Sequence, residues 1–299
     1  MSQAETSCLP PCGFLIIDKP AGLTSHDCVA KARRLLGMRR IGHGGTLDPE
    51  VTGVLPLAVG AATRLLPYLD GTKAYNGAIQ LGVRTSSDDL SGEVLNQAPW
   101  PLLSCSELEQ QLAAFQGVVQ QRPPVVSAVH VDGERAYARA RRGEHLELPE
   151  RTVSIEQLHL LQWDQTTGVL QLQLRCSAGT YVRSLARDLG ERLGCGGALK
   201  SLRRTLALGF DLKQSCSLDS VDSNTVLVEP LEALLHLPAQ RLNAEQWLGW
   251  TRGQRLALDQ PLTAGQPLVI TRPDGSFAGM ARSREDGLLQ PKLVLDAAG

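Results

Sequence analysis

The chain carries short apolar runs with strand spacing and longer segments whose apolar residues recur at helical spacing. Residues 13–20 (GFLIIDKP) predict a buried strand that ends at the proline, and residues 24–37 predict a helix capped by Thr24 or Ser25. Residues 180–194 place their apolar positions on one helical face. Further strands are predicted at 54–60, 74–83, 126–131, 149–163 and 168–176, and further helices at 62–69 and 106–115.

These strands and helices mix without a strict strand–helix–strand repeat, which favours an α+β fold over a doubly wound sheet. From about residue 241 the pattern changes to short apolar runs separated by glycines and prolines, at 267–271, 276–282 and 291–295. Turn signals at such intervals predict a small β-rich module at the C-terminal end.

The composition is ordinary for a globular protein with a substantial core. Of the 299 residues, 42% are hydrophobic and 20% are charged, and the formal net charge is −1. No apolar run approaches the roughly 20 residues that a membrane-spanning helix needs. The polar N-terminus lacks the basic and apolar regions of a signal peptide, so we expect a disordered leader at residues 1–12 of a cytoplasmic protein.

The cysteines and the charge distribution do not identify a function by themselves. The seven cysteines form no pair of CxxC units, so we expect neither a disulfide framework nor a metal site. Two local patches are basic, because residues 31–40 hold five Lys and Arg and residues 135–143 hold four. Such patches suit contacts with phosphate groups. On charge alone a solvated surface is the better interpretation, since mixed surface charge is the norm.

Residues 41–55 (IGHGGTLDPEVTGVL) place a single carboxylate, Asp48, between a glycine-rich approach and Pro49. A phosphate-binding loop is disfavoured, because its motifs require GK[ST] at a helix start or glycines directly after a strand. Metal binding through His43, Asp48 and Glu50 fits no familiar ligand spacing. A helix N-cap followed by proline is the interpretation that these residues alone favour.

Six blocks of sequence, in this order, strongly resemble the TruB family of tRNA pseudouridine synthases, relatives of the dyskerin catalytic domain. They are DKPAGLTSHDCV, IGHGGTLDPEVTGVLPLAVGAATRL, TKAYNGAIQLGVRT, QRPPVVSAVHVDGERAYARARRG, CSAGTYVRSLARDLGERLG and LRRT. The resemblance covers about residues 13–210, and the C-terminal tail has the length and turn-rich character of that family's PUA-type module.

The resemblance implies a fold and a domain organisation. The expected fold is an α+β pseudouridine-synthase core with a mixed, mainly antiparallel sheet and flanking helices, followed by a PUA-like RNA-binding module. We therefore expect a catalytic domain at residues 13–238, with a thumb-like insertion at about 120–150, and the module at 239–299.

The resemblance also gives the loop a chemical role. Family members convert a uridine in the T-loop of tRNA, at position 55, into pseudouridine. The N1–C1′ bond breaks, the base rotates, and C5 joins C1′ without net redox change, so we expect no cofactor and no metal. The resemblance assigns the catalytic carboxylate of this reaction to Asp48. Whether that carboxylate attacks C6, attacks C1′ or assists loss of a ribose proton stays open.

Other residues take their expected roles from the matching motifs. Tyr75 matches the tyrosine that stacks on the target base, and it is the candidate for removing the C5 proton. Arg183 matches the arginine paired with the catalytic aspartate, and Tyr181 matches a tyrosine that contacts substrate. The remaining matches are His43 (stacking where the nucleotide was), Leu202 (against the uracil), Asp89 (a family aspartate), Arg139, Arg141 and Arg142 (thumb cations for RNA), and Lys19, Pro20, Gly45, Thr46 and Pro49 (loop support).

Two other functions would suit the same scaffold. A non-catalytic tRNA-binding or tRNA-folding protein would not need Asp48, Tyr75 and Arg183 together, so the intact set argues against it. A guide-RNA-dependent synthase of the dyskerin type would be expected to carry long basic extensions. We therefore expect a monomer whose partner is the T-stem-loop of tRNA and which contacts no membrane.

Overall fold

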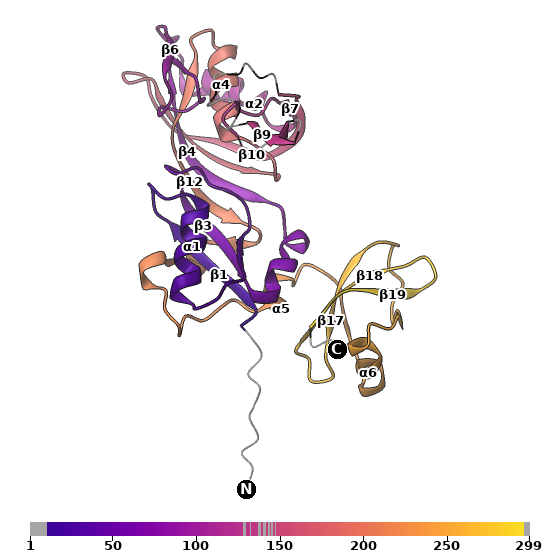
Figure 1. Ribbon diagram of the computed structural model, residues 1–299. Coiled ribbons are helices and arrows are strands. Elements are labelled where there is room, and N and C mark those ends of the chain that lie inside the picture. The colour runs from indigo at the N-terminus through magenta and orange to yellow at the C-terminus, as the bar shows by residue number, and fades with distance from the viewer. Residues whose placement is uncertain are drawn as a thin grey trace.

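The structure is a computed structural model of the chain, and it describes residues 11–127, 130, 131, 133–136, 139, 142, 144, 146 and 148–295. Most of the expected leader, and Arg141 of the expected thumb, lie outside the described residues. The described part forms one large sheet covered by helices, two small two-stranded sheets beside it, and a separate five-stranded sheet near the C-terminus (Figure 1).

The large sheet has ten strands in the described part of the chain. They are β1 (Gly13–Lys19), β2 (Ile41–His43), β3 (Thr52–Val59), β4 (Lys73–Leu81), β7 (Gly117–Gln121), β10 (Arg151–Asp164), β11 (Val169–Cys176), β12 (Gly197–Ala207), β13 (Phe210–Asp211) and β14 (Cys216–Ser217). The order is β14-β1-β3-β12-β4-β11-β10-β7, with β2 paired to β3 and β13 to β12. The β1–β14 and β3–β12 pairs are parallel and the others antiparallel, which confirms the expected mixed, mainly antiparallel sheet.

Three helices cover this sheet, at the places where the apolar spacing predicts them. They are α1 (Ser25–Leu35), α2 (Cys105–Ala113) and α4 (Val182–Arg192). α1 begins with a capping box in which Thr24 and Asp27 satisfy each other's backbone amides, and α2 begins in the same way. α4 buries one face against β12 and β4, so its N-terminus is held rigidly beside the sheet.

The strands β4 and β12 join the two parts of the sheet. In Figure 1 they run from the upper part, which carries α2 and α4, to the lower part, which carries α1, β1 and β3. β3 approaches β12 closely at Gly53, where an added Cβ would lie 2.1 Å from the Arg204 carbonyl oxygen. Gly53 also has a φ of +102°, so this crossing requires glycine.

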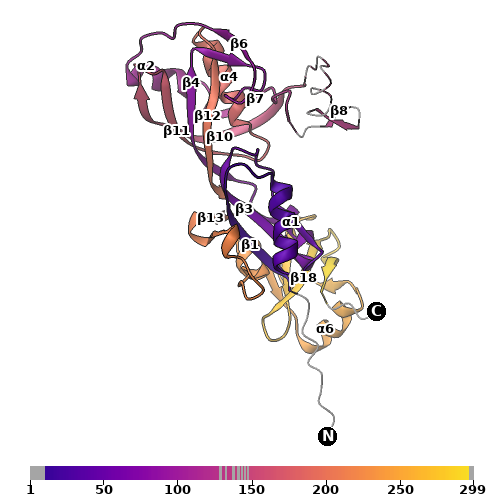
Figure 2. The ribbon, with the colours of Figure 1, turned by 60° about the vertical axis from the view of Figure 1, so that its left-hand side comes forward.

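Two small antiparallel pairs extend from the upper part. β5 (Val83–Thr85) pairs with β6 (Val94–Gln97), and β8 (His130–Val131) pairs with β9 (Glu134–Arg135). Figure 2 shows β8 standing away from the main sheet, on the part of the chain that we expected to be a thumb. Of the strand predicted at 126–131, Val126 and Ser127 are described outside any strand, and His130 and Val131 form β8.

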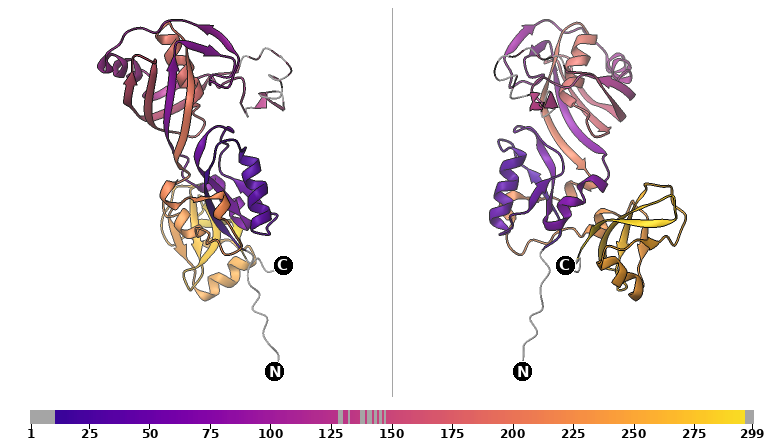
Figure 3. Two further views of the ribbon diagram at one scale, coloured as in Figure 1. Left: turned by 90° about the vertical axis from the view of Figure 1, so that its left-hand side faces the viewer. Right: turned by 45° about the vertical axis from the view of Figure 1, so that its right-hand side comes forward.

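The C-terminal residues form a second sheet with its own core. Its strands are β15 (Ala239–Arg241), β16 (Leu256–Ala257), β17 (Pro267–Thr271), β18 (Phe277–Ser283) and β19 (Leu288–Val294), joined by α6 (Ala244–Thr251). This sheet packs against the lower part through apolar contacts and a hydrogen bond of 3.0 Å from Arg64 Nη2 to the Lys292 carbonyl (Figure 3). The prediction of a small β-rich C-terminal segment agrees with this sheet, although α6 was not predicted.

Two sequence predictions differ from the structure. The helix expected at 62–69 is a pair of 3₁₀ turns, η1 (Gly60–Arg64) and η2 (Leu66–Tyr68), because Pro67 prevents a continuous α-helix. β12 was not predicted as a strand, since its three cations obscure any alternation. Shorter elements are η3 (Leu212–Gln214), η4 (Leu218–Ser220) and α5 (Pro230–Ala233).

Among the described helices, none is long and apolar enough to cross a membrane.

Candidate active site

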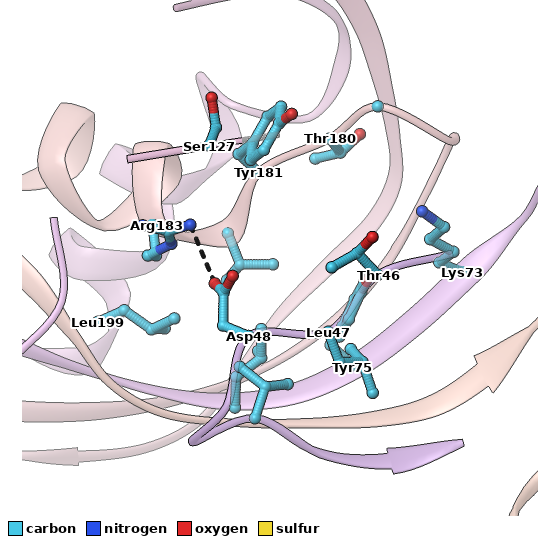
Figure 4. A pocket seen from close by; sticks show the side chains of 14 residues that line it. Thr46, Leu47, Asp48, Lys73, Tyr75, Ser127, Thr180, Tyr181, Arg183 and Leu199 are labelled. Carbon is cyan, nitrogen blue, oxygen red and sulfur yellow. Dashed lines mark ion pairs between the residues drawn. The ribbon is translucent and has the colours of Figure 1, made fainter. Parts of the chain in front are cut away.

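A cavity of about 250 Å³ lies between the loop that follows β2, the start of β4 and the N-terminus of α4. Asp48, Tyr75, Tyr181, Arg183 and Leu202 all line it, although they are far apart in the sequence (Figure 4). The structure therefore brings the three expected catalytic residues and two expected substrate contacts to one place.

The loop that carries Asp48 is fastened from beneath by buried polar contacts. The Lys19 side chain is fully buried, and its Nζ donates to the carbonyls of Pro20 (2.8 Å), Leu23 (2.6 Å) and Pro49 (2.9 Å). Burial lowers the pKa of Lys19, and the nearby carboxylates of Glu50 and Asp48 oppose this by stabilising the cation. The residue after β1 and the residue after Asp48 are thus held together by one side chain.

Arg183 fixes the position of the Asp48 carboxylate. Its Nη2 lies 3.0 Å from Asp48 Oδ2, and its Nη1 lies 3.7 Å from Asp89 Oδ2. The same guanidinium donates to the carbonyls of Ser87 (3.1 Å) and Val126 (2.9 Å). The Arg183 side chain is 8% exposed and that of Asp48 is 45% exposed. The cation is therefore immobilised in the wall, while the carboxylate stays accessible to a ligand.

Tyr75 forms part of the cavity wall at the level of Asp48. It is buried, and this burial raises the pKa of its hydroxyl to about 12, so the phenol is protonated at neutral pH. The nearby Arg204 guanidinium acts in the opposite direction and favours the phenolate. The ring thus presents a flat apolar surface with a polar edge against a cation.

Sequence reasoning missed Arg204, although it lies in the LRRT block. The residue is fully buried on β12, where Nε donates to the Val54 carbonyl (2.7 Å) and Nη2 to the Gly45 carbonyl (3.1 Å). Arg204 therefore ties the strand that follows Asp48 to the glycines that precede it. The spacing of apolar residues does not indicate a buried arginine here. A charged residue is unusual in the centre of a strand unless it has buried hydrogen-bond partners, and these partners are distant in the sequence.

Tyr181 and Leu202 occupy the expected walls of the cavity. Tyr181 is the N-cap of α4. The Gln121 side chain of β7 accepts a hydrogen bond from the Tyr181 backbone N–H (2.8 Å) and donates one to the Tyr181 carbonyl (3.0 Å). Burial raises the pKa of the Tyr181 hydroxyl, so this group is also protonated at neutral pH. Lys73, Ser127 and Thr180 line the cavity as well, and the sequence analysis did not single them out.

Of the other expected residues, Thr46 lines the cavity, and His43, Asp89, Pro20 and Pro49 lie outside it. His43 lies on β2 and makes an edge-to-face contact with His26, with ring centroids 5.1 Å apart. Asp89 lies behind Arg183 and accepts hydrogen bonds from Ser87 and Ser91. Pro20 and Pro49 contribute carbonyls to Lys19, and Thr46 faces the cavity. In the part of the chain that the structure describes, no group of three or more His, Cys, Asp or Glu could hold a metal ion.

The expected thumb arginines are paired with acids. Arg139 Nε lies 2.7 Å from Glu144, and Arg142 lies 2.5 Å from Glu134 and 2.7 Å from Glu144. The Arg142 side chain is half exposed, and exposed ion pairs contribute little to stability. Arg142 can therefore exchange a glutamate for another anion at small cost.

Comparison with protein families covers nearly all of the chain. The family described as TruB family pseudouridylate synthase (N terminal domain) matches residues 33–182. The tRNA pseudouridylate synthase B C-terminal domain matches residues 183–237, and the family described as pseudouridine synthase II TruB, C-terminal, matches residues 238–295.

Individual proteins agree with this assignment. A protein named tRNA pseudouridine synthase B from Parasynechococcus marenigrum is 59% identical over 290 residues, which cover 97% of this chain and 99% of that protein. A protein of the same name from Synechococcus sp. (strain WH7803) is 56% identical over 300 residues, with the same coverage.

Solved structures support the fold. A Cbf5–Nop10–Gar1 complex contains a chain that superposes with a TM-score of 0.72 at 23% identity, covering 94% of this chain and 84% of that one. An H/ACA ribonucleoprotein bound to a substrate RNA containing 2′-deoxyuridine gives a TM-score of 0.70 at 22% identity, with the same coverage. The family matches and the near full-length relatives together confirm the resemblance: the chain belongs to the TruB family of pseudouridylate synthases.

Proposed function

We propose that this protein is a tRNA pseudouridine synthase that isomerises the uridine at position 55, in the T-loop. Full-length relatives that bear the name tRNA pseudouridine synthase B support the tRNA substrate. The observation that carries the proposal is the accessible Asp48 carboxylate held 3.0 Å from a buried arginine, in a cavity lined by two tyrosines.

The reaction requires a correctly positioned uridine and one carboxylate, and it consumes no co-substrate. The N1–C1′ bond of the uridine breaks, the uracil turns, and C5 bonds to C1′; one proton leaves C5 and one is taken up at N1. Atoms and electrons balance without any oxidant or reductant. Asp48 supplies the negative charge or nucleophile at the ribose or the base, while Arg183 holds it in one orientation.

The ring of Tyr75 is suited to hold the flipped uracil by stacking, and Leu202 and Tyr181 would close the other walls. Because the Tyr75 phenol is protonated at neutral pH, it can take the C5 proton only after its own proton has left to solvent. We propose that Arg204, which is fixed beside the tyrosine, stabilises the phenolate that then accepts the C5 proton.

Replacement of Tyr75 by Phe tests this role. Tyr75→Phe should retain stacking and cleave the glycosidic bond, yet stall with the proton still on C5, whereas Tyr75→Leu should also lose substrate affinity. The products of each variant can be separated by chromatography and mass after nuclease digestion. Equal product formation by the Phe variant and the parent would limit Tyr75 to stacking.

We further propose that residues 13–238 are the catalytic domain, that residues 239–299 are a PUA-like RNA-binding module, and that Arg139, Arg141 and Arg142 grip the substrate from the thumb-like segment. His43 would stack where the uridine was, and Asp89 would orient Arg183. The protein would act as a monomer in the cytoplasm, and these statements rest on the family resemblance.

Replacement of Arg139 and Arg142 by Ala should weaken tRNA binding and flatten its salt dependence. Removing one contact with a phosphate should lower the slope of log affinity against log salt by roughly 0.7 to 0.9. The single-turnover rate at saturating tRNA should change little, because neither residue lines the cavity. As the matched control, Glu144→Gln removes the charge of the acid that both arginines share and should strengthen binding. Unchanged affinity and slope in both variants would make this segment a solvated surface.

Release of tritium from tRNA that contains [5-³H]uridine separates the candidate functions. A stand-alone synthase should release one equivalent of tritium per tRNA, with no guide RNA or added protein and in the presence of a chelator. A tRNA-folding protein would release none, and a guide-dependent synthase would release none until a guide is supplied. Inhibition by the chelator that zinc reverses would instead indicate a metal site.

A further inference from the structure

Lys73 is a cation on the cavity wall whose ammonium forms no hydrogen bond or ion pair with any residue that the structure describes. It is the first residue of β4, two positions before Tyr75. Figure 4 shows it on the side of Asp48 opposite Arg183, where Thr46 and Thr180 also face the cavity. An added Cβ at Gly45 would lie 3.8 Å from Lys73 Nζ, so the ammonium rests against the catalytic loop.

The charges around the cavity do not balance. Arg183 is paired with Asp48 and Asp89, whereas Arg204 is buried with carbonyls and Tyr75 as its described partners. Lys73 adds a third cation against these two carboxylates. Burial and the neighbouring Arg204 guanidinium both lower the pKa of Lys73, so keeping this cation costs folding free energy. Such a group is typical of a site whose counter-ion arrives with the ligand.

The substrate of the proposed function offers three kinds of group to this cavity: the uracil, the ribose and the phosphodiester. Only the phosphodiester is charged. A lysine ammonium is a compact point charge that suits a phosphate oxygen, and threonine hydroxyls are frequent phosphate donors. We propose that Lys73 binds the phosphodiester that flanks the isomerised uridine, with the hydroxyls of Thr46 and Thr180 beside it. This inference rests on the function proposed above.

The position of Lys73 gives this contact a purpose in catalysis. A phosphate held at Lys73 and a ribose held at Asp48 fix one nucleotide at two points on opposite sides of the cavity. Phosphate contacts determine register and carry no sequence information. Lys73 would therefore set the depth to which the nucleotide enters, while the tyrosines and Leu202 contact the base.

The experiment combines protein variants with a neutral linkage in the RNA. T-stem-loop RNAs carry one methylphosphonate on the 5′ side or the 3′ side of the target uridine, and they are compared with unmodified RNA. Lys73→Met removes the charge, and Lys73→Arg keeps it. Lys200→Met, at an exposed lysine of β12 outside the cavity, is the matched control.

With unmodified RNA, Lys73→Met should weaken binding roughly tenfold to a hundredfold, the range for a hydrogen bond to a charged group. Its salt slope should fall by roughly 0.7. One of the two methylphosphonates should weaken binding to the parent by a similar factor and have no further effect on Lys73→Met. Lys73→Arg should bind close to the parent. The free Lys73→Met protein should melt at the same or a higher temperature, because it no longer buries an unpaired cation.

Other results would overturn the proposal. If Lys73→Met weakens binding while both methylphosphonates still weaken it further, the lysine contacts the uracil or the ribose. If Lys73→Met melts at a lower temperature and binds RNA normally, the lysine is a structural residue. The proposed function has a separate readout, since pseudouridine formed by the parent on unmodified RNA tests it whatever the behaviour of Lys73.

Discussion

Asp48→Asn should abolish pseudouridine formation, with a single-turnover rate lower by roughly 10⁴-fold or more, the range for removal of an essential nucleophile or charge. The amide keeps the size of the carboxylate but supplies neither a negative charge nor a nucleophilic oxygen. Arg183 keeps Asp89 and two carbonyls as partners, so the cavity should hold its shape. The affinity for tRNA should stay close to that of the parent, because phosphate and stacking contacts carry most of the binding.

Glu50→Gln is the matched control for this variant. Glu50 lies two residues further along the same loop and is exposed, and it does not line the cavity. The same loss of one negative charge should leave the rate within about twofold of the parent, as expected for a surface substitution. A residual rate of Asp48→Asn within tenfold of the parent would remove Asp48 from the catalytic role.

Arg204→Met should have the largest effect on stability. It removes the Arg204 donor from the buried Val54 carbonyl and the partly buried Gly45 carbonyl, at about 1–3 kcal/mol for each, partly offset because a buried cation is removed. We expect the free energy of unfolding to fall by about 2–4 kcal/mol. The rate at saturating tRNA should also fall, by roughly 10²-fold, because displacement of a catalytic group by about 1 Å costs this much.

Arg203→Met serves as the neighbouring control. Arg203 is partly exposed and pairs with Asp18 at 2.7 Å, so its loss should cost at most about 1 kcal/mol. Arg204→Lys should recover only part of the stability, since one ammonium cannot reproduce the geometry of a guanidinium. Denaturant titration and single-turnover kinetics measure both effects. An Arg204→Met protein as stable and active as the parent would show that the loop is held by other contacts.

Much of the fold was predictable from local pattern. The helices at α1, α2 and α4 have clear apolar faces, and two of them begin with side-chain caps that sequence rules identify. The central strand β12 was missed for a physical reason. Arg204 within it is buried because carbonyls from two distant loops meet it, and Arg203 pairs with Asp18 across the sheet. No window of sequence contains those partners.

The candidate site likewise contains some residues that the sequence identified and others that only the structure identifies. The motifs identified Asp48, Tyr75 and Arg183, and the structure brings all three to one cavity. Lys73, in the same motif as Tyr75, carried no signal of its own, because a lysine at the start of a strand is usually solvated. The role that we propose for it depends on Asp48 and Asp89 being paired with Arg183, which only the structure shows. The pairing of Arg142 with two glutamates was likewise invisible to a count of basic residues.

The proposed function can be tested by mapping pseudouridine in an unmodified tRNA transcript after incubation with the pure protein, without guide RNA or added cofactor. We expect one pseudouridine per tRNA, at position 55 of the T-loop, and none with Asp48→Asn. If the parent protein binds the transcript but forms no pseudouridine, or forms it outside the T-loop, the proposed function is wrong.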